Sequence, residues 1–170
     1  MPLLHIFDSS DSRILQTVDA RGETNRVPIS DGNAFLGIMD GLARKALEPS
    51  TAAFDRVLFE THGSSGKITF GNTYISGSYL AGCTGRGWAN IVTLNARVYF
   101  NGCNVASDPN GWAFLEAAAA VFLTPGGGEV FGQTSLGFGN PFNGHVVHLW
   151  GSTRRLYVDQ TGRIVERFEQ

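Results

Sequence analysis

The sequence predicts an α/β domain in which helices cover the faces of a mainly parallel central sheet and the C-terminal tail adds antiparallel strands. Short apolar runs rich in valine, isoleucine and phenylalanine alternate with segments of helical periodicity, a pattern typical of this fold class. Glycine makes up 22 of the 170 residues and falls largely between these runs, which indicates many tight turns. No linker or domain-sized repeat divides the chain, so we treat residues 1–170 as a single domain.

The first half of the chain yields five predicted elements. They are a strand at 3–7, a hairpin or irregular excursion at 13–30, an amphipathic helix of about 13 residues that ends near Pro49, a strand at 54–63 that runs straight into a turn, and a hairpin at 67–76. Ser30–Asn33 offers N-caps for the helix, and its apolar residues recur three and four positions apart. Gly71-Asn72 is a two-residue hairpin turn.

The second half contains two further buried strands, a strongly apolar helix and the tail. The predicted elements are a short apolar piece at 79–80, a glycine-rich connection at 82–87, strands at 96–103 and 130–132, a helix at 112–123, and antiparallel edge strands at 146–150, 154–158 and 163–168. Asp108–Gly111 favours a helix start, and Thr124–Gly128 ends that helix. Because Gly126–Gly128 follows a helix and no Lys-Ser/Thr comes after it, a turn is favoured over a phosphate-binding loop.

Two strand segments share one pattern. Residues 56–59 and 97–100 both read Arg-Val-apolar-Phe, and six positions after each arginine stand His62 and Cys103 respectively. If the two strands are parallel neighbours in similar register, both side chains emerge at the same height beyond the carboxyl ends of the strands. That edge of an open parallel sheet is where such folds place their ligand sites.

A cysteine beside a histidine can act as a nucleophile and its acid/base partner. Gly63 follows His62 and Gly102 precedes Cys103, so bare backbone flanks both residues and would let a substrate backbone approach. The backbone N–H groups of Gly63 and Cys103 are the candidate oxyanion donors. Each residue also has a structural alternative: His62 as a strand-end histidine held by local hydrogen bonds, and Cys103 as an inert core thiol.

The segments just described resemble the caspase-like cysteine peptidases. In that superfamily, which includes caspases, metacaspases, clostripain, gingipain, legumain and separase relatives and bacterial CHAT-type domains, a hydrophobic strand ends in His-Gly and a later one ends in the cysteine. The resemblance covers residues 54–135 well and residues 3–47 loosely. It implies a single caspase-like domain of bacterial type, a Cys103 thiolate nucleophile, His62 assisting the leaving group, and oxyanion donors near Gly63 and Cys103. The context Asn-Gly-Cys-Asn-Val differs from the Gln-Ala-Cys-Arg-Gly of caspases, so aspartate specificity is not carried over.

Several other residues are weaker candidates for a functional role. Arg13, Arg86 and Gly102 are candidates for substrate binding by their position, as is the loop 139–144. We expect Cys83 to be a loop thiol in a connection that could line the groove, and Arg154-Arg155 to be a solvated pair on an edge strand. The remaining histidines have no metal-ligand spacing with the cysteines; they are His5, His145 and His148. We therefore predict neither a metal nor another cofactor.

Composition and charge weigh against two further classes of function. Thirteen basic and 15 acidic residues give a formal net charge of −2, whereas a nucleic-acid binder carries a strongly basic patch. The longest apolar run, Ala113–Leu123, contains Glu116 and is shorter than the ~18–20 residues of a membrane span. We expect no nucleic-acid or membrane partner. The N-terminus lacks a signal-peptide pattern, which favours a cytoplasmic location; export without a classical signal is the alternative.

The leading functional prediction is a cysteine endopeptidase that hydrolyses peptide bonds of a protein or peptide substrate through a Cys103–His62 dyad. An alternative of another class is a catalytically inactive caspase-like domain used for binding or assembly, including a homodimer formed through an edge strand. A third alternative is thiol-dependent acyl transfer on a non-peptide amide.

Overall fold

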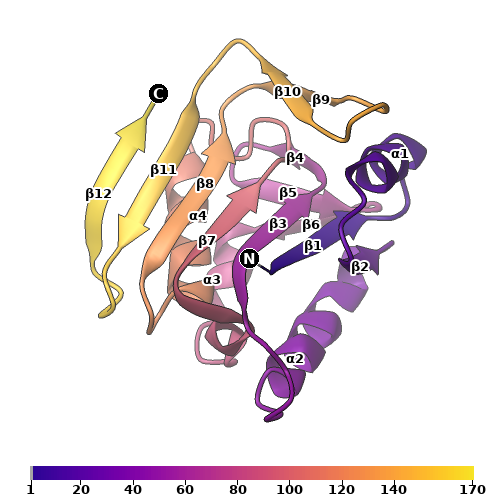
Figure 1. The fold of residues 1–170 in the computed structure, drawn as a ribbon. Helices are drawn as coiled ribbons and strands as arrows, with labels where there is room; N and C mark the ends of the chain where they lie inside the picture. Colours follow the sequence, from indigo (N-terminus) through magenta and orange to yellow (C-terminus); the bar gives the residue numbers. More distant parts are fainter. Residues whose placement is uncertain (1) are drawn as a thin grey trace.

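Residues 2–170, the part of the chain that the computed structural model describes, are organised around a seven-stranded mixed sheet of order β12-β11-β8-β7-β3-β1-β2 (Figure 1). Its strands are β1 (Leu3–Asp8), β2 (Asn25–Ile29), β3 (Phe54–Glu60), β7 (Val92–Phe100), β8 (Gly128–Gln133), β11 (Thr153–Val158) and β12 (Ile164–Glu169). The first five run parallel to their neighbours, and β11 and β12 are antiparallel additions. The predicted α/β class, with a mainly parallel sheet and an antiparallel tail, is confirmed.

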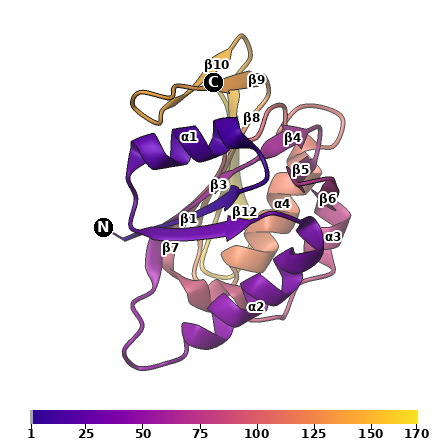
Figure 2. The same cartoon turned by 90° about the vertical axis from the view of Figure 1, so that its right-hand side faces the viewer.

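Helices cover the two faces of the sheet unequally. The helical elements are α1 (Ser12–Arg21), η1 (Gly32–Ala34), α2 (Phe35–Lys45), α3 (Gly77–Ala81), η2 (Trp88–Ile91) and α4 (Gly111–Phe122). Figure 2 shows α2 and α4 on one face of the sheet and α1 on the other. Phe59 of β3 lies between Phe35 of α2 and Phe122 of α4, with ring centroids 6.4 and 5.7 Å away, so the main core lies on the α2–α4 face. Among residues 2–170, no helix has the length and apolar character needed to cross a membrane.

The segment predicted as a hairpin or irregular excursion is instead α1 followed by the parallel strand β2. Asp11 caps α1 by accepting a 2.7 Å hydrogen bond from the backbone N–H of Arg13. Gly22, at φ 69°, ends the helix in the left-handed conformation, and its N–H donates to the Val18 carbonyl. Of the β-branched residues that suggested strands, Ile14, Thr17 and Val18 lie on one helix face, where Val18 is fully buried, and Val27 and Ile29 lie in β2. Pro28 is tolerated because β2 is an edge strand.

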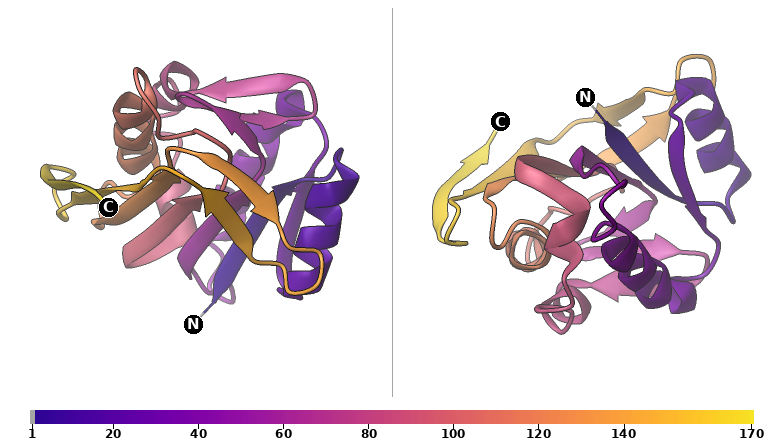
Figure 3. Two further views of the ribbon diagram at one scale, coloured as in Figure 1. Left: turned by 90° about the horizontal axis from the view of Figure 1, so that it is seen from above. Right: turned by 60° about the horizontal axis from the view of Figure 1, so that its bottom comes forward.

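One predicted tail strand lies outside the main sheet. β10 (Val146–Leu149) pairs with β9 (Leu136–Gly139) in a separate two-stranded sheet. Seen from above, this β9–β10 hairpin crosses over the ends of the central strands (Figure 3). The prediction that residues 146–150 form an edge strand of the central sheet is therefore wrong. A third sheet contains β4 (His62–Ser64), β5 (Lys67–Phe70) and β6 (Thr73–Ser76), which includes the predicted hairpin.

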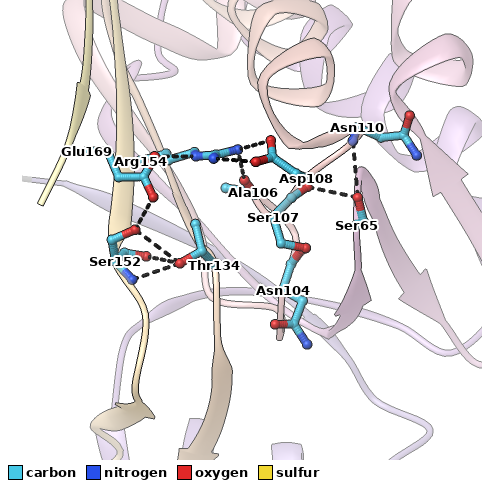
Figure 4. Close-up of polar contacts among 10 residues, drawn as sticks. All are labelled: Ser65, Asn104, Ala106, Ser107, Asp108, Asn110, Thr134, Ser152, Arg154 and Glu169. Atoms are coloured by element: carbon cyan, nitrogen blue, oxygen red, sulfur yellow. Dashed lines mark hydrogen bonds and ion pairs between the residues drawn. The ribbon is translucent and has the colours of Figure 1, made fainter.

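The prediction that Arg154 is a solvated residue on an edge strand is wrong. Arg154 is buried, because its strand β11 lies between β8 and β12. Its guanidinium pairs with Asp108 at 2.8 Å and with Glu169 at 2.9 Å, and it donates to the Ala106 carbonyl at 2.8 Å (Figure 4). The same group stacks on Trp112, 5.0 Å from the ring centroid. Arg154 therefore ties the connection between β7 and α4 to the C-terminal strands.

Candidate active site

The expected proximity of His62 and Cys103 requires β3 and β7 to pair in parallel with a particular register, and the structure has that register. Arg56 lies opposite Arg97 and Phe59 opposite Phe100 in a parallel ladder. His62 and Cys103 therefore leave the sheet at matching heights, beyond the carboxyl ends of neighbouring strands. Both line one cavity of about 580 Å³. Both residues thus lie at the edge of the sheet where the sequence placed them.

The segment that carries Cys103 is held by backbone hydrogen bonds to neighbouring strands. The N–H of Asn104 donates to the Ser135 carbonyl and the N–H of Ala106 to the Gln133 carbonyl, both at 2.9 Å. On the other side, Gly66 donates to the Val105 carbonyl, also at 2.9 Å. The Ser65 hydroxyl adds two contacts to the loop that leads to α4, because it donates to the Ser107 carbonyl and accepts from the N–H of Asn110 (Figure 4). The thiol thus stands on a turn fixed from both flanks.

The two glycines beside the dyad bring its segments together. A Cβ on Gly102 would lie 2.7 Å from Cγ2 of Val105 and 3.3 Å from Cα of Gly63, and a Cβ on Gly63 would also collide with Val105. Neither glycine lines the cavity. Their missing side chains are needed for the close approach of two protein segments, whereas the sequence suggested an approach of substrate backbone.

The Cys103 thiol is partly exposed and lies against the β9–β10 hairpin. Its Sγ accepts a hydrogen bond from the N–H of Gly137 at 3.3 Å. Within residues 2–170, the backbone N–H of Cys103 donates to no protein acceptor. This N–H therefore remains the candidate oxyanion donor that the sequence suggested.

His62 has a carboxylate partner that the sequence did not reveal. Its Nε2 lies 2.7 Å from Oδ2 of Asp11, the N-cap residue of α1. Hydrogen bonds from the Arg13 side chain and from His62 hold the pKa of Asp11 well below its usual value, so the carboxylate is ionised at neutral pH. With Nε2 engaged, Nδ1 is the ring nitrogen available to a thiol or a substrate. Recognising residues 12–21 as a helix would have identified Asp11 as its cap.

The cavity lies between α1, the carboxyl ends of β3 and β7, and the β9–β10 hairpin. Arg13 lines it as predicted; its side chain is 79% exposed and pairs with Asp11 at 2.9 Å. Other lining residues are Ile14, Gln16, Thr17, Glu60, Thr61, Asn101, Leu136, Gly137, Phe138, Gly139, Pro141 and Val146. The hairpin packs directly on α1, because Gly139 contacts Thr17 closely. Part of the predicted loop 139–144 thus contributes to the site.

Two ionisable residues near His62 and Cys103, the buried Glu60 and the half-buried His148, were given no role at the site by the sequence reasoning. Glu60 is 4% exposed, and its Oε2 lies 3.0 Å from Nε2 of His5 and 3.7 Å from the Arg21 guanidinium. His148 of β10 faces Gly137 across the hairpin, and both of its ring nitrogens are sealed without a hydrogen-bond partner. Burial lowers the pKa of His148 below its usual 6.5, against smaller opposing effects of the Ser135 backbone and Glu60.

Arg86 and Cys83 lie outside this cavity. Arg86 Nε donates to Asp40 at 3.0 Å, and this contact lowers the pKa of Asp40 to about 2. Cys83 is 5% exposed in the main core and its thiol donates to the Tyr79 carbonyl, while burial raises its pKa. Residues 82–87, the connection that the sequence suggested could line the groove, do not line this cavity. No group of three or more His, Cys, Asp or Glu side chains within residues 2–170 is arranged to hold a metal ion.

The fold and the site together define an α/β domain with a candidate Cys–His site at the carboxyl edge of its parallel strands. The chain belongs to the family described as a domain of unknown function (DUF4347), whose sequence profile matches residues 40–124, half of the chain. This segment contains His62 and Cys103, whereas Asp11 and the β9–β10 hairpin lie outside it. No curated protein matches the chain significantly.

Proposed function

We propose that the protein is a cysteine endopeptidase of the caspase-like type, with Cys103 as nucleophile and His62 as general acid/base. The observation that carries this proposal is the matched exit of the two residues from adjacent parallel strands into one cavity. The sequence resemblance over residues 54–135 supports the same assignment. A cytoplasmic location, where cellular thiols would keep Cys103 reduced, remains our expectation.

In this mechanism the Cys103 thiolate adds to the carbonyl carbon of the scissile peptide bond, and the π electrons of the carbonyl move to its oxygen. The N–H of Cys103 would donate to this oxyanion; Gly63, the second donor that the sequence suggests, does not line the cavity. The C–N bond then breaks as His62 gives a proton to the departing amine. Water hydrolyses the resulting thioester while His62 takes up the proton of the water, and the thiol is restored. Asp11 keeps the imidazole in position throughout.

The proposal is tested by comparing Cys103→Ala and His62→Ala with the matched control Cys83→Ala in a mixed peptide library under reducing conditions. We expect wild type and Cys83→Ala to cleave and the other two variants to lose turnover. We also expect iodoacetamide to label Cys103 before Cys83, because Cys83 is buried. Absence of cleavage by reduced wild type, or full activity of Cys103→Ala, would overturn the proposal.

A binding or assembly module is the second candidate, and the β9–β10 hairpin is the observation that favours it. Its solvent-facing side chains are apolar: Leu136, Phe138, Val147 and Leu149 are 42–58% exposed. An exposed apolar patch of this kind is typical of a protein interface. Native mass spectrometry combined with thiol labelling separates the two functions, since an unreactive Cys103 in a stable oligomer favours assembly.

A further inference from the structure

One face of the central sheet has no covering layer over most of its strands. Figure 1 looks onto this face: within the part of the chain that the structure describes, no helix lies in front of β7, β8, β11 or β12. α1 is the helix on this side, and it packs at the β1 end of the sheet (Figure 2). A mainly parallel sheet normally has both faces covered. The side chains that β3, β7, β8, β11 and β12 present on this side form a surface that we call the open face.

The open face consists of two cross-strand rows. From β3 to β12, the first row is Arg56, Arg97, Glu129, Tyr157 and Glu166, and the second is Leu58, Tyr99, Phe131, Arg155 and Phe168. Residues between the rows point to the other face of the sheet, where Val98 and Val130 are fully buried in the core. Contacts within one copy join the rows, because Arg155 pairs with Glu129 at 3.3 Å. The two rows therefore form one continuous surface.

The composition of the open face is typical of a protein interface. Seven of its ten side chains are aromatic rings or arginines, the types that are enriched where proteins bind one another. Several remain accessible: the side chains of Arg97 and Glu166 are 56% and 51% exposed, and Phe168 is 42% exposed. Tyr99 stacks on Phe131 with ring centroids 4.7 Å apart, which gives the centre of the surface a flat aromatic patch. A surface of this kind is suited to contact with another protein surface.

The order of charges makes the open face complementary to a second copy of itself. A two-fold axis that lies along β8, between two facing sheets, places β3 opposite β12 of the second copy and β7 opposite its β11. The basic end of the first row then meets the acidic end, with Arg56 opposite Glu166. In the second row Tyr99 faces Arg155, and Phe131 meets its own counterpart at the axis. A two-fold axis across the strands would bring each strand opposite itself and would not pair Arg56 with Glu166.

Like charges meet beside this axis at Glu129. Its carboxylate already contacts Arg97 at 3.0 Å and Arg155 at 3.3 Å in the same copy. Four guanidinium groups would therefore surround the two carboxylates, so that no pair of bare anions opposes association at this position.

α1 limits where the second copy can lie. The helix stands on the side of the open face at the β1 end, so a copy shifted toward β1 would collide with it. With the axis along β8, α1 of each copy lies beyond β12 of the other. Five strands about 4.8 Å apart and about 20 Å long give about 480 Å² per copy. The total of about 1,000 Å² is at the lower limit for a specific interface, and the dimer is therefore a weak one.

We propose that the open face is the interface of a weak, symmetric homodimer in which two central sheets pack face to face. Aromatic rings occupy the centre of this interface, and the contact between Arg56 and Glu166 occurs once at each end. The arrangement differs from the pairing of edge strands, because it uses side chains of the central strands and leaves the backbone edge of β12 free. It is independent of the chemistry proposed for Cys103.

Charge reversal at the two ends of the first row tests the proposal. Sedimentation velocity from about 1 µM to about 1 mM should show a reversible wild-type dimer with a dissociation constant of about 10–300 µM. Arg56→Glu and Glu166→Arg each affect two symmetric contacts and should each raise this constant about tenfold or more. An equimolar mixture of the two variants should recover it to within about threefold of wild type, because unlike charges again face each other. Lys67→Glu, an exposed residue of β5 outside the open face, is the control and should dimerise like wild type.

Phe131→Glu separates this interface from other modes of association. It places two further carboxylates at the axis and should leave a monomer at every concentration, whereas a dimer formed through strand edges or through the β9–β10 hairpin would survive it. Thermal unfolding checks the fold of each variant, and the mixture of single reversals still decides the matter if Phe131→Glu does not fold. A wild type that stays monomeric, single reversals that dimerise like wild type, a mixture that does not recover, or a dimer that survives Phe131→Glu would overturn the inference. Peptide cleavage is measured separately, so none of these results bears on the proposed function.

Discussion

Replacing Asp11 with asparagine isolates the charge that faces His62. Asp11 does three things in the structure: its carboxylate lies 2.7 Å from Nε2 of His62, it caps α1 through the N–H of Arg13, and it pairs with the exposed Arg13 guanidinium at 2.9 Å. Asparagine is as good an N-cap as aspartate, so the helix keeps its start while the charge is removed. Asp11→Asn therefore tests the contact with His62 separately from the stability of α1.

The expected size of the effect follows from the contact and its exposure. A hydrogen bond to a charged group contributes about 1.5–3 kcal/mol when it is well shielded. The His62 side chain is 48% exposed, so water screens the pair and we take about 1–1.4 kcal/mol. This corresponds to a five- to tenfold loss in kcat/KM, at about 1.4 kcal/mol per factor of ten. Asp11→Ala should lose the cap as well, at about 1 kcal/mol or about 2–4 °C in Tm.

The assay combines peptide hydrolysis, the pH profile of Cys103 alkylation and thermal unfolding. For Asp11→Asn we expect the loss in kcat/KM and an altered alkylation profile with Tm unchanged within about 1 °C. Asp19→Asn is the control, because Asp19 is an exposed residue of the same helix that pairs with Arg26. The reasoning is refuted if Asp11→Asn has the rate and pH profile of wild type, or if its loss of activity merely follows a loss of stability.

Three further predictions concern the support of the site. Gly63→Ala should lower stability by about 1–3 kcal/mol in urea unfolding and slow Cys103 alkylation, because its Cβ would collide with Val105; wild-type values for both would contradict the described packing. Arg154→Met should cost about 2 kcal/mol, since the Ala106 carbonyl loses its donor and two ion pairs are lost; an unchanged Tm would refute this. Burial lowers the pKa of His148, so the unfolded chain binds its proton more readily and stability falls as pH drops below 6.5. His148→Gln should therefore show a smaller difference in Tm between about pH 7.5 and about pH 5 than wild type, and an equal difference would contradict the assignment.

The sequence was sufficient to predict the part of the site that depends on strands. The Arg-Val-apolar-Phe pattern occurs in both β3 and β7 and indicates which positions of the two strands are equivalent. The observed ladder pairs Arg56 with Arg97, as this pattern predicts. Strand periodicity is local, so a pattern match can reveal the register of two parallel strands. The hairpin turn at Gly71-Asn72 and the helix before Thr124 were predictable for the same reason.

The parts that escaped prediction depend on contacts between distant segments. Asp11 and His62 are 51 positions apart, and β-branched residues in α1 obscured the helix that carries the aspartate. Arg154 and Asp108 are 46 positions apart, and nothing local distinguishes a buried arginine from an exposed one. β9 alternates apolar residues with glycine and β10 is largely apolar, but the two strands pair with each other above the sheet.

This division of the site has a consequence for its chemistry. The dyad stands on the central strands and their turns, where Phe59 and Phe100 stack in the core at 4.8 Å, so its geometry is set by the best-packed part of the molecule. The cavity walls come from α1 and from a hairpin that contacts the rest of the chain through glycine, at Gly137 against the thiol and at Gly139 against Thr17. Substitutions on the solvent-facing sides of α1 and the hairpin can therefore alter which side chain enters the cavity without moving the thiol. Substitutions next to Gly63 would also move the thiol, because that glycine packs against the segment that carries Cys103.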